Sequence, residues 1–175
     1  DNTDIGLADE GSGNLDFIVT NNSEESITAN ITVTPIFTNG DNSNQGESID
    51  FSITVNPSAQ VDNIDDINVS NGTLIGLIEF TTVNTGGTTT YEWTNDNTDI
   101  GLVDSGNESI PEFTAINDGD IPITGTIEVT PILEENGVIC SGDSETFTIT
   151  VNPDAQVNEI DDLVYNDGDL VQIPF

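Results

Sequence analysis

The sequence FSITVNPSAQV at residues 51–61 returns, with two changes, as FTITVNPDAQV at residues 147–157. The interval from 51 to 147 also separates ANITVTPIF at residues 29–37 from GTIEVTPIL at residues 125–133. Self-similarity at a fixed interval is the signature of a repeat architecture. The chain is therefore expected to consist of modules of about 95 residues that share one fold.

The repeated stretches have the pattern of β-strands. Apolar and polar residues alternate in ITVTPIF at 31–37 and in FSITV at 51–55, as in strands with one buried face. Between these two stretches lies Asn39-Gly40, and the second copy has Asn136-Gly137 in the equivalent place. Both residue types tolerate positive φ, so each pair predicts a tight hairpin turn.

One complete module contains about seven strand-like segments and no sustained helical period. Seven short strands in fewer than 100 residues are typical of an immunoglobulin-like β-sandwich, so the predicted fold is all-β with tandem sandwiches. The expected strands are residues 60–69, 73–82, 88–94, 100–103, 110–116, 123–133 and 144–151.

The predicted module boundaries fall at Pro57 and Pro153, each of which ends a strand and is followed by only a short linker. Linkers of this kind are expected to be semi-rigid. Residues 1–57 are then the C-terminal part of one sandwich, residues 58–153 a complete one, and residues 154–175 the N-terminal strands of a third.

The chain ends match each other within this repeat. Asp1 corresponds to Asp96 and Phe175 to Phe80, so joining two copies leaves only residues 81–95 unmatched. Asp1 is thus expected to lie inside a module, after the equivalent of the strand that contains Trp93.

Two arrangements would satisfy this pattern. The modules are either part of one long tandem polypeptide, or residues 154–175 of one copy complete residues 1–57 of its neighbour. A half-sandwich alone would expose its inner face and unpaired strand edges. In both arrangements the expected partners are copies of the same module, joined head to tail in a line.

The charge composition excludes several classes of partner. The chain has 33 acidic residues and no Lys, Arg or His, whereas average composition predicts roughly 20 Lys and Arg. Nucleic acids and anionic membrane surfaces are excluded, because both are bound through basic side chains. The composition favours an extracellular location, where the carboxylates would recruit dissolved cations; a lineage-wide acidic bias, as in halophiles, is the alternative.

Three stretches together resemble a known family: YEWTNDNTDIGL at residues 91–102, IEVTPIL at 127–133 and FTITVNP at 147–153. They are similar to the PKD-like modules repeated in very large secreted proteins of Bacteroidota. This resemblance implies an immunoglobulin-like spacer or adhesive unit on the cell surface, without catalysis. Relatives often carry a cysteine bridge; here Cys140 occupies one place, and Ser70 and Tyr165 occupy the other, so no bridge is expected.

Carboxylates gather after each predicted boundary, and a calcium ion at the junction is one interpretation, because calcium takes six to eight oxygen ligands. No EF-hand spacing is present, and a solvated acidic surface is the alternative. No other cofactor is expected. The candidate ligands are Asp62, Asp65, Asp66, Asp154, Glu159, Asp161 and Asp162.

Trp93 and Tyr91 lie two residues apart in one predicted strand, so they share a face. The favoured role is a core anchor between the sheets, and a sugar-stacking platform is the alternative. Glycosylation sequons occur at Asn21, Asn30, Asn68, Asn71 and Asn107.

An enzyme is not expected. Without His, no Ser-His or Cys-His pair exists, and the single VDSG stretch at residues 103–106 lacks the second loop that an aspartic protease requires. The predicted function is a structural repeat of an extracellular filament or adhesin stalk. Binding of carbohydrates or surfaces is the alternative function.

Overall fold

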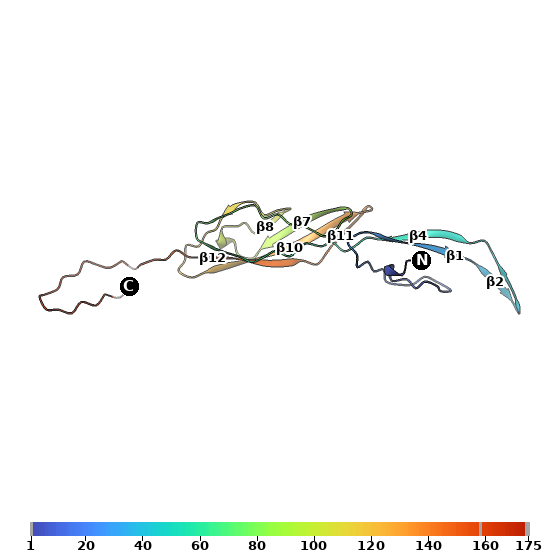
Figure 1. Ribbon diagram of the computed structural model, residues 1–175, viewed down its shortest axis with the longest axis horizontal. Coiled ribbons are helices and arrows are strands. Elements are labelled where there is room, and N and C mark those ends of the chain that lie inside the picture. Colours follow the sequence, from blue (N-terminus) through green and yellow to red (C-terminus); the bar gives the residue numbers. More distant parts are fainter. Residues whose placement is uncertain (1, 158, 174–175) are drawn as a thin grey trace.

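The computed structural model describes residues 2–157 and 159–173 and shows an elongated, all-β chain (Figure 1). The helical elements among the described residues are two short 3₁₀ turns, η1 (Thr3–Ile5) and η2 (Thr98–Ile100). The strands are β1 (Ile27–Val33), β2 (Ile36–Asn39), β3 (Asn42–Gln45), β4 (Ile49–Val55), β5 (Ile67–Ser70), β6 (Leu74–Ile75), β7 (Thr88–Asn95), β8 (Ser105–Asn107), β9 (Phe113–Thr114), β10 (Ile123–Glu135), β11 (Val138–Ser141) and β12 (Glu145–Asn152).

A six-stranded sheet dominates the central region, residues 58–153. Its order is β5-β12-β10-β7-β8, and β11 pairs with the end of β10. β5 runs parallel to β12, while the other neighbours are antiparallel. The short pair β6–β9 and the bridge between Ile78 and Ile110 lie outside this sheet and form a second layer.

The hydrophobic core lies between these two layers. β10 and β12 alternate buried and less buried positions along their length, as strands with one covered face do. Their buried side chains pack against the aromatic residues of β7 and against the loop after η2. The largest fully buried members of the core are Trp93, Phe147, Ile100, Ile110, Ile127, Ile149, Val129 and Val151.

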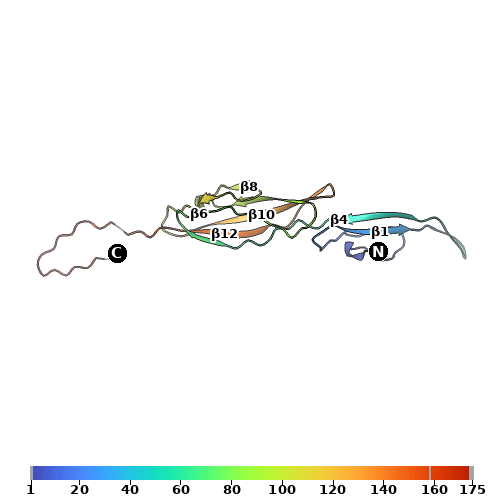
Figure 2. The same cartoon turned by 45° about the horizontal axis from the view of Figure 1, so that its top comes forward.

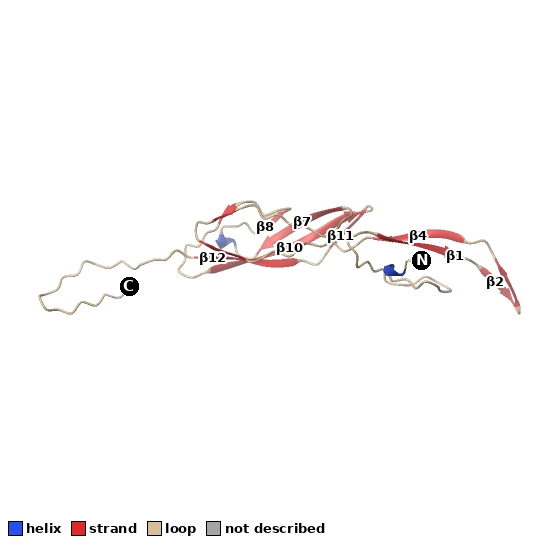
Figure 3. Ribbon diagram, in the orientation of Figure 1, coloured by secondary structure: helices blue, strands red, loops and turns tan. Residues whose placement is uncertain are grey.

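The N-terminal region, residues 2–57, contains a two-stranded sheet, β1–β4, and a hairpin, β2–β3, that lies at one end of the molecule (Figures 1 and 2). The register of β1 with β4, Ile27 opposite Val55, repeats that of β10 with β12, Ile123 opposite Val151. Residues 159–173 of the C-terminal region extend from the other end without an assigned strand (Figure 3).

The all-β prediction is confirmed, but several strand bounds were wrong. The predicted strand at 100–103 is the turn η2 and a loop, and those at 60–69, 73–82 and 110–116 shorten to β5, β6 and β9. β8 and β11 were not predicted. The predicted strand at 31–37 divides between β1 and β2, whereas β10 continues through Pro131, because β7 pairs with it across that position.

The two predicted hairpin turns differ. Asn136 and Gly137 have φ of 52° and 75°, as a two-residue turn with both residues in the left-handed region requires. In the N-terminal hairpin, however, Asn39 pairs with Asn42, so the turn residues are Gly40 and Asp41. The prediction of an Asn39-Gly40 turn was therefore wrong by one residue. The predicted equivalences of Asp1 and Phe175 lie outside the described residues.

Candidate functional site

The candidate site is the inner face of β1 and β4. This strand pair has the same local geometry as its counterpart in the central region, β10 and β12. Thr28 and Thr54 hydroxyls lie 2.9 Å apart, and the equivalent Thr124 and Thr150 hydroxyls are also 2.9 Å apart. These cross-strand pairs fix the same strand alignment in both regions.

A side-chain amide ties the preceding loop to each sheet. The Asn21 amide donates to the carbonyls of Glu25 and Val55, at 2.9 and 2.8 Å. The Asn117 amide donates to the carbonyls of Ile121 and Val151, both at 2.8 Å. The loop that contains Asn21 is therefore held to its sheet in the same way as the loop that contains Asn117 in the central region.

Burial, in contrast, differs sharply between equivalent side chains. Phe51 has an exposed fraction of 41%, and its counterpart Phe147 of 2%. Val33 is 41% exposed, while Val129 is 0% exposed. The inner face of β1 and β4 is thus an apolar surface that the described residues of the N-terminal region leave open to solvent.

An open groove of about 700 Å³ lies over this face, between residues 6–17 and the end of β1. In the central region, the counterpart of this space holds Trp93, which pairs with Val129 and lies against Gly106. A Cβ at Gly106 would overlap the indole ring, so this position requires glycine. The groove therefore marks the place that β7 fills in the central region.

The C-terminal region carries a second exposed apolar set. Val164 and Leu170 have exposed fractions of 96% and 83%. Leu163, Tyr165 and Val171 are each close to half exposed. Exposed apolar side chains gathered in one short segment are typical of an interaction site.

A hydrogen-bond cluster joins the N-terminal and central regions. Asn56 donates to the carbonyl of Glu135 at 2.7 Å, and its own side-chain oxygen accepts from Ser26 at 3.0 Å and from Asn136 at 2.8 Å. The Thr85 amide donates to the carbonyl of Glu24 at 2.9 Å. These contacts join the end of β4 to the β10–β11 hairpin. The semi-rigid linker stays a prediction.

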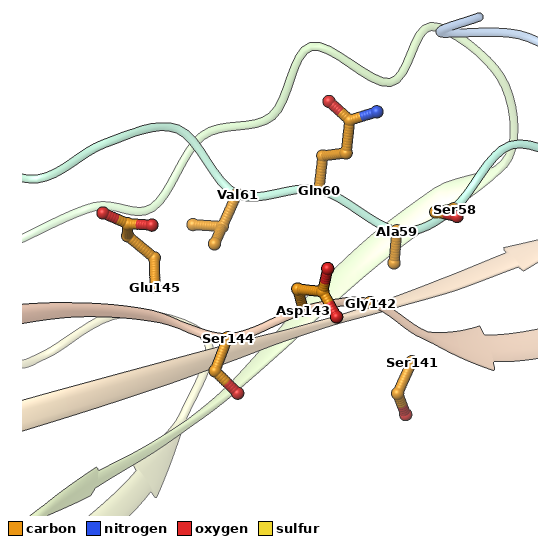
Figure 4. A pocket seen from close by; sticks show the side chains of 9 residues that line it. All are labelled: Ser58, Ala59, Gln60, Val61, Ser141, Gly142, Asp143, Ser144 and Glu145. Carbon is orange, nitrogen blue, oxygen red and sulfur yellow. The ribbon is translucent and has the colours of Figure 1, made fainter. Parts of the chain in front are cut away.

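The linker itself borders a polar groove of about 450 Å³, between residues 58–61 and 141–145 (Figure 4). Ala59 is buried against Gly142, where a Cβ would overlap the Ala59 carbonyl. The carboxylates of Asp143 and Glu145 come from the opposite wall of this groove. Among the groups lining it, no cation balances these charges, since the chain has no basic side chain.

The predicted calcium ligands are dispersed where the structure describes them. Asp62 accepts a hydrogen bond from the Thr81 hydroxyl at 2.5 Å, and Asp154 accepts one from Asn71 at 3.0 Å. Asp66 accepts from the Thr148 amide at 2.7 Å, beside the parallel β5–β12 pair.

The remaining candidate ligands are exposed and lie in the loop before β5 or in the C-terminal region: Asp65, Glu159, Asp161 and Asp162. Within residues 2–157 and 159–173, no three acidic or cysteine side chains converge as a metal site requires. The junction calcium ion stays a prediction.

Among the described residues, Asp66 and Tyr91 have shifted pKa values. The backbone and side-chain hydrogen bonds from Thr148 lower the pKa of Asp66, because they stabilise its charged form. Burial raises the pKa of Tyr91, and the charges of Asp62 and Glu108 add to this effect. Asp66 therefore stays ionised while Tyr91 stays neutral near pH 7, which suits a structural role for both.

The structure places Trp93 and Tyr91 in the core. Trp93 is 2% exposed and Tyr91 is 7% exposed, and the Tyr91 ring lies 5.5 Å from Phe80, tilted by 59°. Their burial is that of core anchors and leaves neither ring free to stack on a sugar. The Trp93 Nε1 has no hydrogen-bond partner among the described groups. Cys140 is a free, partly buried thiol whose sulfur lies 3.9 Å from the Pro57 carbonyl.

The five sequons are not equivalent. The Asn21 amide donates two hydrogen bonds, and a glycan on its nitrogen would leave one hydrogen to donate, so one bond would be lost. The Asn71 amide donates to Asp154 at the exposed surface. Asn68 accepts from the Asn152 amide on β12. Asn30 and Asn107 are exposed.

Comparison with known protein families finds no match, and no curated protein matches the chain. In the part of the chain that the structure describes, neither 3₁₀ turn is long or apolar enough to span a bilayer.

Sequence reasoning missed the cluster around Asn56, which has no local pattern in the chain. A signal was nevertheless present, because Asn56 and Asn152 recur at the repeat interval and follow the same strand. In the central region, the Asn152 amide likewise donates to a backbone carbonyl, that of Val69, at 3.0 Å.

Proposed function

We propose that this chain is a non-enzymatic structural repeat of an extracellular filament or adhesin stalk. In this proposal, PKD-like, immunoglobulin-like modules follow one another in a line, with the bounds 1–57, 58–153 and 154–175. Strands equivalent to the C-terminal region cover the open face of each N-terminal region.

The topology of the central region supports the immunoglobulin-like part of the proposal. An edge strand parallel to the last strand, β5 on β12, combines with an antiparallel β12-β10-β7-β8 sheet. The β6–β9 pair covers this sheet from the other side of the core. Two packed sheets with this arrangement of strands are typical of immunoglobulin-like sandwiches.

The observation that carries the proposal is the contrast between Phe51 and Phe147. Fully burying an aromatic or large aliphatic side chain contributes roughly 1.5–3 kcal/mol. Phe37, whose counterpart Leu133 is fully buried, is 72% exposed. Exposed apolar side chains on both the β1–β4 sheet and the β2–β3 hairpin make their coverage by further strands favourable.

The acidic surface supports a location outside the cell. A net charge of −33 keeps separate arrays soluble through mutual repulsion, and dissolved cations screen that repulsion along each array. The contacts between residues 24–26, Asn56 and the β10–β11 hairpin would give the array a defined direction.

Negative-stain electron microscopy of the purified chain tests this function. We expect thin, unbranched filaments whose length increases with protein concentration and with ionic strength, because salt screens carboxylate repulsion. Parallel samples with a calcium chelator test the junction ion. Dispersed particles at every concentration and salt level, combined with binding to a glycan array, would favour the adhesion module instead.

A further inference from the structure

We propose that residues 163–171 of one copy bind the N-terminal region of a second copy in one register. Residues 163–166 add to β4 as a parallel strand opposite residues 53–56, and residues 170–171 pair with residues 17–18. This inference rests on the proposed function and specifies its partner, a second copy of this chain.

The central region supplies the template for this register. In the β5–β12 pair, Ile67 lies opposite Ile149 and Ser70 opposite Asn152. In the β6–β9 pair, Ile75 lies opposite Phe113. Shifting all of these positions by the repeat interval places Leu163 opposite Ile53, Asn166 opposite Asn56, and Val171 opposite Phe17.

The receiving surface already has the shape of the template. The Thr20 amide donates to the Ile5 carbonyl at 2.9 Å, and the equivalent Ile116 amide donates to the Ile100 carbonyl at 3.0 Å. Ile18, which would face Leu170, is 86% exposed. Little ordering is needed on this side, which lowers the entropic cost of association.

Residues 166–169 of the incoming segment form the same turn as residues 70–73 of the central region. The Asp169 amide donates to the Asn166 carbonyl at 3.1 Å, as the Thr73 amide donates to the Ser70 carbonyl at 3.2 Å. The third residue of each turn is a glycine with positive φ, 94° at Gly168. This turn sets the direction of residues 170–171 relative to residues 163–166 before the segment binds.

The side chains of the incoming segment alternate as the receiving face requires. In the template, Ile67 and Val69 pack against the core, while Asn68 points to solvent. The same alternation in the C-terminal region places Leu163 and Tyr165 on the apolar face and leaves Val164 outside.

The geometry favours a second copy over self-insertion. The C-terminal region and the β1–β4 sheet lie at opposite ends of the elongated molecule, with the central region between them (Figures 1 and 2). A contact between two different surfaces of identical chains is heterologous and continues in a line unless the rotation closes a ring.

The β4 edge is independent of the groove that corresponds to β7. In the central sheet, β5 borders β12, whereas β7 borders β10 on the far side. Pairing on β4 therefore leaves the exposed edge of β1 unaffected.

Disulfide trapping of full-length chains tests the register. Both chains carry Cys140→Ser; one also carries Thr54→Cys and the other Val164→Cys, at positions predicted to be opposite and outward-facing. Paired strands lie about 4.8 Å apart, within the Cα separation that a disulfide spans. The matched control replaces Thr54→Cys with Asp50→Cys, which the register displaces by about 13 Å.

We expect several-fold more heterodimer from the Thr54→Cys and Val164→Cys mixture than from the control mixture, on a non-reducing gel after mild oxidation. Trp93 fluorescence checks that every variant keeps a folded central region. Equal heterodimer yields in the two mixtures would overturn the inference.

Electron microscopy of the same preparations separates the two proposals. Filaments together with equal yields would overturn the register and leave the filament function standing. Absence of filaments together with equal yields would overturn both.

Discussion

The N-terminal and central regions share hairpin register and side-chain hydrogen bonds, yet equivalent apolar residues are exposed in one and buried in the other. Ile27 and Ile123 begin strands that pair in the same way with β4 and β12. Phe51 and Phe147 follow at matching positions and differ from 41% to 2% in exposed fraction. Local sequence thus fixes strand pairing and loop shape, whereas burial depends on strands that come from elsewhere.

The largest expected effect is at the matched phenylalanines. Phe147→Ala should lower the free energy of unfolding of the central region by about 3–5 kcal/mol, because it leaves a cavity in a packed core. Phe51→Ala should leave that transition unchanged within about 0.5 kcal/mol, as for an exposed site. Urea unfolding monitored by Trp93 fluorescence measures both. Similar shifts for the two variants would mean that the regions do not differ as described.

The matched asparagines should give a smaller contrast. Asn117→Ala should cost about 1–3 kcal/mol, because the amide is 2% exposed and two carbonyls would lose their donor. Asn21→Ala removes the same bonds in the open region, so we expect faster hydrogen exchange near residues 21–25 without a change in the Trp93 transition. An unchanged exchange rate would contradict the shared loop geometry.

At the junction, Asn56→Ala should weaken the hold between the two regions by about 1 kcal/mol, the usual net contribution of a hydrogen bond. We expect a broader distribution of end-to-end distances in single-molecule energy transfer between dyes on the N-terminal and central regions. Asn44→Ala, on the exposed strand β3, is the control. Identical distributions for the two variants would show that the cluster does not orient the regions.

The smallest effect concerns acid stability. The pKa of Asp66 is lowered in the fold, so its contribution is present above the ordinary aspartate value and is lost as the pH falls through the lowered one. Asp66→Asn should therefore flatten the acid side of the plot of stability against pH. The effect should be small, because Asp66 is fully exposed to solvent. Thermal unfolding between pH 2 and pH 6 measures it, with Asp65→Asn as the control. If Asp65→Asn flattened the profile equally, Asp66 would have no particular role in acid stability.

Much of the fold follows from the sequence, because the strands with strict alternation are those with one covered face. The stretches around Ile127 and Phe147 were predicted as strands, and both became core strands. The prediction failed where partners decide the outcome. Residues 60–66 were part of a predicted strand yet pair with no strand, and β8 has a glycine at its centre, which has low strand propensity.

The candidate site was predictable in part. The repeat indicated that residues 1–57 would show an open face, and Phe51 and Val33 are indeed exposed. The sequence could not show that Asn21 and Thr20 would hold the same bonds as their counterparts Asn117 and Ile116. These bonds join residues far apart in the chain, such as Asn21 and Val55, so a short-range residue pattern does not reveal them.

Hydrogen exchange of β4 over a range of protein concentrations tests the central claim most directly. We predict that amides within residues 53–55 of β4 slow toward the rates of residues 149–151 of β12 as concentration rises, because a second copy pairs with this part of the edge, while β12 itself is unchanged. Rapid exchange of β4 at every concentration, in samples that contain filaments, would contradict the claim.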